Sequence, residues 1–201
     1  TLQDLLLDDA DATVEDAVYE RFGLSLVPCG TSLSAFREAD PTLLREVVAE
    51  LAADTDVLLL DSAAALGSQS AVLPLVLADR TVVVLQPTIP SLSDGLKVQE
   101  YARSYGTDTA GVLFNRVRDD EAIDRVAEQA ERYFGGPTLA TIPESDAARA
   151  ARRAGDPLLA HAPDSDAAAA YRRAADQLEI QDGDEGTVAD RFRSAVIPES
   201  P

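Results

Sequence analysis

The chain has 201 residues, of which 46% are hydrophobic, so it is long enough for one α/β domain with its own core and short for two. Its 36 acidic residues outnumber 17 basic ones, and a net charge of −19 repels nucleic-acid phosphate, so we expect no direct nucleic-acid partner. One cysteine, Cys29, excludes an intramolecular disulfide, and no signal peptide or apolar run of roughly 18 residues is visible. We therefore expect a cytoplasmic protein. The spread of acids along the chain, with Lys97 as the only lysine, is typical of a salt-loving cytoplasm.

In the first half of the chain, short apolar runs alternate with predicted helices. Residues 24–28 form one such run, and Asp40-Pro41 marks a helix start, because an N-cap acid precedes a proline at the first helical position. Residues 57–60 predict a buried strand that ends on Asp61, and residues 71–77 predict a helix although they include Pro74.

The second half alternates strands with helices. Strands are predicted at 81–86, 110–114 and 138–142; helices are predicted from the capping-box pattern "SLSD" at 91–94 to about 105, over 123–133, near 145–154 and over 165–178. This alternation, with strands of unbroken Val, Leu and Ile, predicts an α/β fold with a doubly wound, mostly parallel sheet and helices on both faces. We expect one domain over residues 1–180 and a polar linker and tail over 181–201.

Polar side chains follow the predicted strands. Asp61 follows the first strand, Pro87 the second, Asn115 and Arg116 the third, and Pro143-Glu144 the fourth. Ligands of open parallel sheets bind beyond the carboxyl ends of the strands, so this edge is the predicted site. An acid after a buried strand is the Walker B arrangement, which serves Mg²⁺, but by itself Asp61 is equally able to cap the next helix.

Five segments in order resemble the MinD/ParA family of deviant Walker A ATPases. "DVLLLDSAAALG" resembles the family pattern "hhhhDxPAGhG", and "LQPTIPSLSDGLK" resembles the segment around "TxPExxSxxDxxK". "GVLFNRV" is similar to "GxVxNRh", the stretch "IPESDAARAARRAGDPL" resembles the family's closing segment, and "VPCGTSLSAFREADP" resembles the stretch before Walker B in archaeal MinD-like proteins. The resemblance covers about residues 1–180 and implies a P-loop NTPase fold whose N-terminal βαβ unit lies upstream of Thr1.

On the phosphate side, the resemblance implies that Asp61 is the Walker B acid for Mg²⁺ and the catalytic carboxylate. Gly67 would let the backbone pass close to a γ-phosphate. Two departures stand out: three alanines replace the family's "PAG", and no glycine-rich "KGGxGKT" loop occurs in the 201 residues.

On the base side, the resemblance implies that Asn115 hydrogen-bonds adenine, because an amide offers both a donor and an acceptor. The backbone at 142–144, which is Ile142, Pro143 and Glu144, would line the other side of the base. Arg116 would pack on the nucleotide or pair with an acid, and Pro87 belongs to the same family pattern.

The resemblance therefore implies ATP and Mg²⁺ as cofactors and an ATP-dependent homodimerisation switch that controls the position of a protein partner. Asp94 and Lys97 would face a second subunit or a partner, or else serve as a helix-capping acid and a solvated lysine. The tail, with Val188, Phe192 and Val196 four residues apart, is either a disordered end or a peripheral membrane anchor. The alternative function is that of a non-hydrolysing relative acting as a scaffold or regulator.

Overall fold

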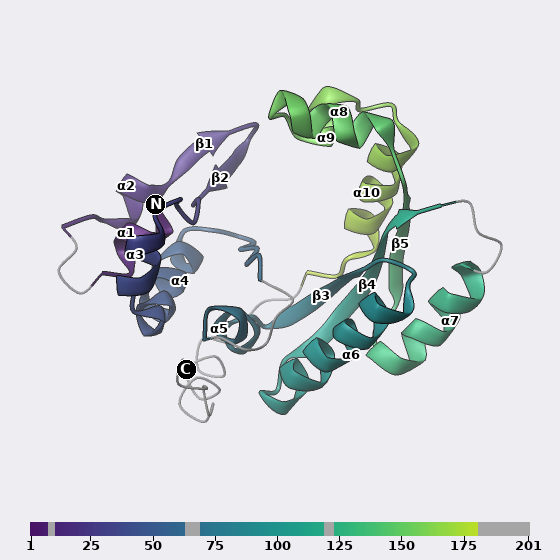
Figure 1. Ribbon diagram of the computed structural model, residues 1–201, viewed down its shortest axis with the longest axis horizontal. Coiled ribbons are helices and arrows are strands. Elements are labelled where there is room, and N and C mark those ends of the chain that lie inside the picture. The colour runs from purple at the N-terminus through teal and green to yellow at the C-terminus, as the bar shows by residue number, and fades with distance from the viewer. Residues whose placement is uncertain (8–10, 63–68, 119–122, 181–201) are drawn as a thin grey trace. The chain divides into compact units, whose positions relative to one another are not determined.

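The computed structural model describes residues 1–7, 11–62, 69–118 and 123–180, and the chain divides into two compact units (Figure 1). The first unit comprises Thr1–Leu77 and the second begins at Ala78. The first unit holds α1 (Leu2–Leu5), α2 (Val14–Ala17), β1 (Tyr19–Arg21), β2 (Leu24–Leu26), α3 (Leu33–Glu38), the 3-10 helix η1 (Pro41–Leu43), α4 (Leu44–Ala53) and α5 (Gln69–Leu77). The second unit holds β3 (Arg80–Leu85), α6 (Ile89–Ser104), β4 (Asp108–Val117), α7 (Ile123–Phe134), β5 (Thr138–Pro143), α8 (Asp146–Ala154), α9 (Leu158–His161) and α10 (Asp166–Gln177).

The first unit contains an antiparallel hairpin of β1 and β2. Phe22 and Gly23 form its two-residue turn, both with positive φ (55° and 75°), which matches the twist of the flanking strands. Part of the apolar run at 24–28 thus forms strand β2, which pairs with β1, and this hairpin was not predicted from the sequence. The predicted helix start at Asp40 is confirmed, because the Asp40 side chain accepts a hydrogen bond from the Thr42 N–H (2.8 Å).

The predicted strand at residues 57–60 is wrong. These residues form no strand, and no described residue pairs with them. Leu59 is 82% exposed and Val57 is also exposed. A strand exists only when a neighbour takes up its backbone N–H and C=O groups, and an apolar run alone does not supply that neighbour.

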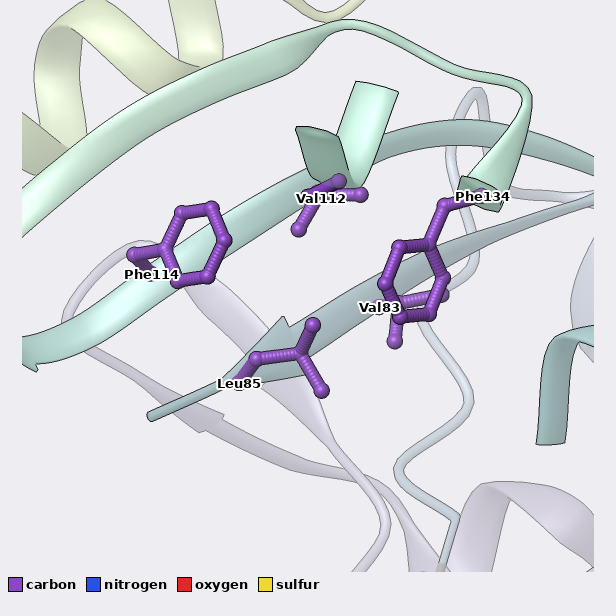
Figure 2. Packing of buried hydrophobic residues seen from close by; sticks show 6 residues of the cluster. Val83, Leu85, Val112, Phe114 and Phe134 are labelled. Carbon is purple, nitrogen blue, oxygen red and sulfur yellow. The ribbon is translucent and has the colours of Figure 1, made fainter. Parts of the chain in front are cut away.

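The second unit is built on a parallel sheet in the order β3-β4-β5. The prediction of parallel strands alternating with helices is therefore confirmed here. Side chains of β3 and β4 pack against α6 and α7 on one face of the sheet (Figure 2). The buried members of this cluster are Val83, Leu85, Val112, Phe114, Ala130 and Phe134.

The other face of the sheet carries α10. Leu113, which alternates with Val112 and Phe114, packs on this side with Ile142 and with two alanines of α10, Ala167 and Ala170. The small alanine side chains let the helix lie close to β5, so helices cover both faces, as the fold prediction required.

The helices of the second unit begin and end at recognisable caps. Ser145 caps α8 and Ser165 caps α10, each accepting a hydrogen bond from an N–H three residues on (3.3 Å), and Gly155 ends α8 at φ 75°. The capping box predicted at residues 91–94 is wrong, because α6 begins at Ile89. Pro90 sits in its first turn, where no backbone N–H is needed.

Candidate functional site

The carboxyl ends of β3, β4 and β5 lie together at one edge of the sheet in the second unit. Leu85 is paired with Phe114, and Phe114 with Thr141, so the residues that follow them meet at this edge. Six of the predicted site residues are brought here, and they are Pro87, Asn115, Arg116, Ile142, Pro143 and Glu144. Ligands of open parallel sheets bind at such an edge.

A bulge in β4 carries Asn115 and Arg116. The β4–β5 ladder pairs Phe114 with Thr141 and next Val117 with Pro143, so two residues of β4 stand opposite one residue of β5. The sequence predicted that the strand would end at residue 114, but it continues to Val117 beyond the bulge. Bulges are common beside binding sites, where they redirect a side chain.

The bulge fixes the Asn115 amide. Arg116 adopts φ 55°, a left-handed conformation that costs a non-glycine residue roughly 1–2 kcal/mol. In this conformation the Arg116 N–H donates to Asn115 Oδ1 (2.8 Å). This hydrogen bond turns the side-chain oxygen of Asn115 toward its own strand, and the oxygen keeps a second lone pair for another donor. The same contact fixes the orientation of the Asn115 NH₂ group. Arg116 itself is exposed, and none of the ion pairs within the described ranges includes it.

Two arginines hold the Glu144 carboxylate. Arg118 Nε donates to one oxygen (2.9 Å) and Arg149 Nη1 to the other (3.1 Å), while Arg149 also pairs with Asp146. The hydrogen bond and charge of Arg118, and then those of Arg149, lower the pKa of Glu144. The Glu144 backbone N–H donates to Val117 O (2.8 Å), so the start of the β5–α8 turn is tied to the end of β4.

Sequence reasoning missed these two arginines. It gave neither of them a role in the site. The pair of Arg118 with Glu144 depends on the register of β4 against β5, which a single sequence does not reveal, whereas Arg149 lies five residues from Glu144 in the chain.

Ile142 and Pro143 contribute differently. The Ile142 side chain is only 2% exposed and packs against α10, so only its backbone is available to a ligand. Beside Pro143 lies a pocket of about 360 Å³ lined by residues 143–146 and 164–167. Four of these eight residues are acidic, and two of the four, Glu144 and Asp146, pair with arginines.

The turn after β3 is held by Ser91. Its hydroxyl accepts a hydrogen bond from the Gln86 N–H (2.9 Å), and the Thr88 N–H donates to Gln86 O (2.8 Å). The hydroxyl predicted to cap α6 therefore fixes the strand end that leads into Pro87, which is partly buried.

Asp61 belongs to the first unit, where it is exposed and follows a segment that is not a strand. Gly67 and the alanines at 63–65 lie outside the described residues. Within the described ranges, no group of three or more His, Cys, Asp and Glu side chains could hold a metal ion. A single carboxylate still fits Mg²⁺, which keeps several waters and relies on substrate phosphates for the remaining ligands. No described helix is long and apolar enough to span a bilayer.

Comparison with protein-family models finds no match. Two curated proteins of Methanocaldococcus jannaschii, both described as uncharacterized ATP-binding proteins, are 35% and 33% identical over 150 and 152 residues, or 74% and 75% of this chain. The chain spans only 55% and 56% of the lengths of these two relatives.

Solved structures of MinD proteins share the fold. The Pyrococcus furiosus cell division ATPase MinD is 30% identical with a TM-score of 0.75, over 88% of this chain and 74% of that one. The Pyrococcus horikoshii septum site-determining protein MinD, solved with Mg-ADP, is 29% identical with a TM-score of 0.77, over 89% of this chain and 73% of that one. A ParA family ATPase of Chlorobium tepidum, 20% identical over 90% of this chain and 75% of its own, has the same fold with a TM-score of 0.71. The chain belongs to the MinD/ParA family of ATPases.

Proposed function

We propose that the protein is a Mg²⁺-dependent ATPase of the MinD/ParA type, whose ATP-bound state dimerises and controls the position of a partner in the cell. The observation that carries this proposal is the bulge at Asn115, which presents an oriented amide at the carboxyl edge of the sheet. Adenine offers an acceptor, N7, beside a donor, the 6-amino group, and a fixed amide can pair with both.

The base side of the site lies in the second unit. Asn115 binds the edge of the adenine ring, the backbone at Ile142 and Pro143 lines the other side, and Arg116 packs near the nucleotide.

The metal side depends on Asp61. Bound Mg²⁺ would neutralise charge on the β- and γ-phosphate oxygens during hydrolysis. Asp61 would hold the ion through its carboxylate or a coordinated water, and Gly67 would allow close approach of the backbone to the γ-phosphate. No glycine-rich phosphate loop occurs in these 201 residues, so the phosphates need further groups beyond them.

The partners are inferred from the family. The two Pyrococcus relatives are a cell division ATPase and a septum site-determining protein, which supports division-site placement, with partition and motility machinery as other cargoes. On α6, Lys97 and Asp94 form an exposed ion pair (3.0 Å), and this face would meet a second subunit or a partner. We place the protein in the cytoplasm, with peripheral membrane contact through residues 181–201 as a variant of the same proposal.

A scaffold that does not hydrolyse ATP is the second candidate. One observation favours it: among the described residues, Asp61 follows an unpaired segment rather than a strand. In that case the bulge would survive as an inherited feature of the fold.

ATP binding and hydrolysis by the full gene product, measured with Mg²⁺ in high salt, test the proposal. We expect Asn115→Ala to weaken binding of both ATP and ADP, and Asp61→Ala to lower hydrolysis and the Mg²⁺ dependence of binding. Asp156→Asn is the matched control, because it removes a partly exposed carboxylate that pairs, within the described ranges, with His161 (3.4 Å) in the same unit as Asn115. A full-length product that binds no ATP would refute the ATPase and leave the scaffold.

A further inference from the structure

On the C-terminal side of the β4 bulge, the contacts that hold the chain in place involve one residue, Glu144. Beyond Asn115 and Arg116, the ladder resumes at Val117 opposite Pro143, and the Glu144 N–H then donates to Val117 O (2.8 Å). The next residue, Arg118, reaches back to the Glu144 carboxylate (2.9 Å). The backbone of Glu144 therefore holds Val117, the last residue of β4, and its side chain holds Arg118, the residue that follows.

The second arginine ties this end to a helix. Arg149 lies on α8 and donates to the other oxygen of Glu144 (3.1 Å) while also pairing with Asp146 in the first turn. The Glu144 carboxylate thus joins β4, β5 and α8. Each of the two oxygens accepts a hydrogen bond from one guanidinium group, so both ends of the carboxylate are fixed.

We propose that Glu144 is a positioning residue for the nucleotide base: its carboxylate, held by Arg118 and Arg149, keeps the β4 bulge closed so that the Asn115 amide stays oriented toward the base. This inference rests on the proposed function, and it adds Arg118 and Arg149, which do not touch the base, to the residues that set its affinity.

The charge state of Glu144 agrees with this role. The two arginines lower the pKa of its carboxyl below the ordinary value of 4.5, so the group is ionised and paired at neutral pH. Its side chain is 34% exposed and that of Arg118 is 83% exposed, so each pair is weak and partly screened by salt. We expect the loss of either ion pair to weaken the affinity for ATP by a factor of about two to five.

A double-mutant cycle on the full gene product separates positioning from direct contact. ATP affinity, measured with Mg²⁺ by titration calorimetry, is compared for the unmodified protein, Glu144→Gln, Arg118→Gln and the double variant, with Asp156→Asn as the control. We expect each single variant to bind ATP about two to five times more weakly than the unmodified protein. The affinity of the double variant should be no lower than that of the single variant with the lower affinity. Losses that multiply in the double variant would mean that each side chain acts on the ligand separately, and would overturn the proposal.

Hydrogen exchange without nucleotide tests the closure itself. The amides of Arg116 and Glu144 donate the two hydrogen bonds of the bulge, and we expect both to exchange faster in Glu144→Gln and Arg118→Gln and unchanged in Asp156→Asn. Unchanged exchange in the first two variants would overturn the proposal whatever the nucleotide result. If the unmodified protein binds no ATP, the proposed function fails, and faster exchange would still support the closure of the bulge by Glu144.

Discussion

Gly95 in α6 gives a sharp test of how the helix packs on the sheet. A Cβ at this position would lie 2.4 Å from Leu85 Cδ2 and 3.2 Å from two ring atoms of Phe134. Leu85 is 3% exposed and Phe134 is 1% exposed, so neither side chain has open space to move into. Ala in a helix interior gains about 1 kcal/mol over Gly, whereas overpacking a close-packed core costs about 1–3 kcal/mol. We therefore expect Gly95→Ala to lower the free energy of unfolding by up to about 2 kcal/mol.

Urea denaturation followed by tyrosine fluorescence measures this change. The chain has no tryptophan, and four of its five tyrosines, all but Tyr19, lie in the second unit. Leu85→Ala removes the atom in the way and by itself costs about 2–5 kcal/mol. On that background, Gly95→Ala should become stabilising by about 1 kcal/mol, the helix propensity alone. A stabilising Gly95→Ala in the otherwise unmodified protein would refute the close approach of α6 to β3.

Three further predictions concern the site edge and the surface. Because Arg116 stands at φ 55°, Arg116→Gly should leave stability unchanged or slightly higher, while the β-branched Arg116→Val should lower it by about 1–2 kcal/mol in urea denaturation. The folded-state pKa of Glu144 is depressed, so its contribution is fully present above its ordinary value of 4.5 and is lost as the pH falls through the lower folded value. Melting temperatures of Glu144→Gln should accordingly lie below those of the unmodified protein at pH 7 and converge with them at acid pH; a constant gap would contradict the ion pairs. With a net charge of −19, the melting temperature should rise as KCl increases from about 0.1 M to about 1 M, where the screening length falls from about 10 Å to about 3 Å, and a fall would contradict the salt-adapted interpretation.

The parts of the fold that depend on local signals were predictable. β3, β5 and α7 lie within one or two residues of their predicted positions, because unbroken apolar runs and the helical period identify them without knowledge of their partners. The caps of two helices are local features of the same kind, since Ser165 caps α10 and Gly155 ends α8. These features depend on interactions within a few residues.

Two of the failures share a different cause, which is that each depends on a partner distant in sequence. Residues 57–60 have the composition of a buried strand, but strand formation depends on a neighbour, and none is found among the described residues. The bulge at Asn115 follows from the register of β4 on β5, and its left-handed residue is Arg116, a type that gives no local signal for positive φ. The pair of Arg118 with Glu144 depends on the same register.

The division of the chain allows the base and metal assignments to be tested separately. Asn115 belongs to the second unit and Asp61 to the first, and each would serve a different part of the nucleotide. Adenosine has a base and no phosphates, so Asn115→Ala should weaken its binding to the full gene product while Asp61→Asn should not. The increase in ADP affinity on adding Mg²⁺ should instead survive Asn115→Ala and fall in Asp61→Asn, because a carboxylate ligand to Mg²⁺ acts only when the ion is present. If Asp61→Asn weakened adenosine binding as much as ADP binding, Asp61 would be supporting the fold rather than the metal, and the Walker B assignment would be wrong.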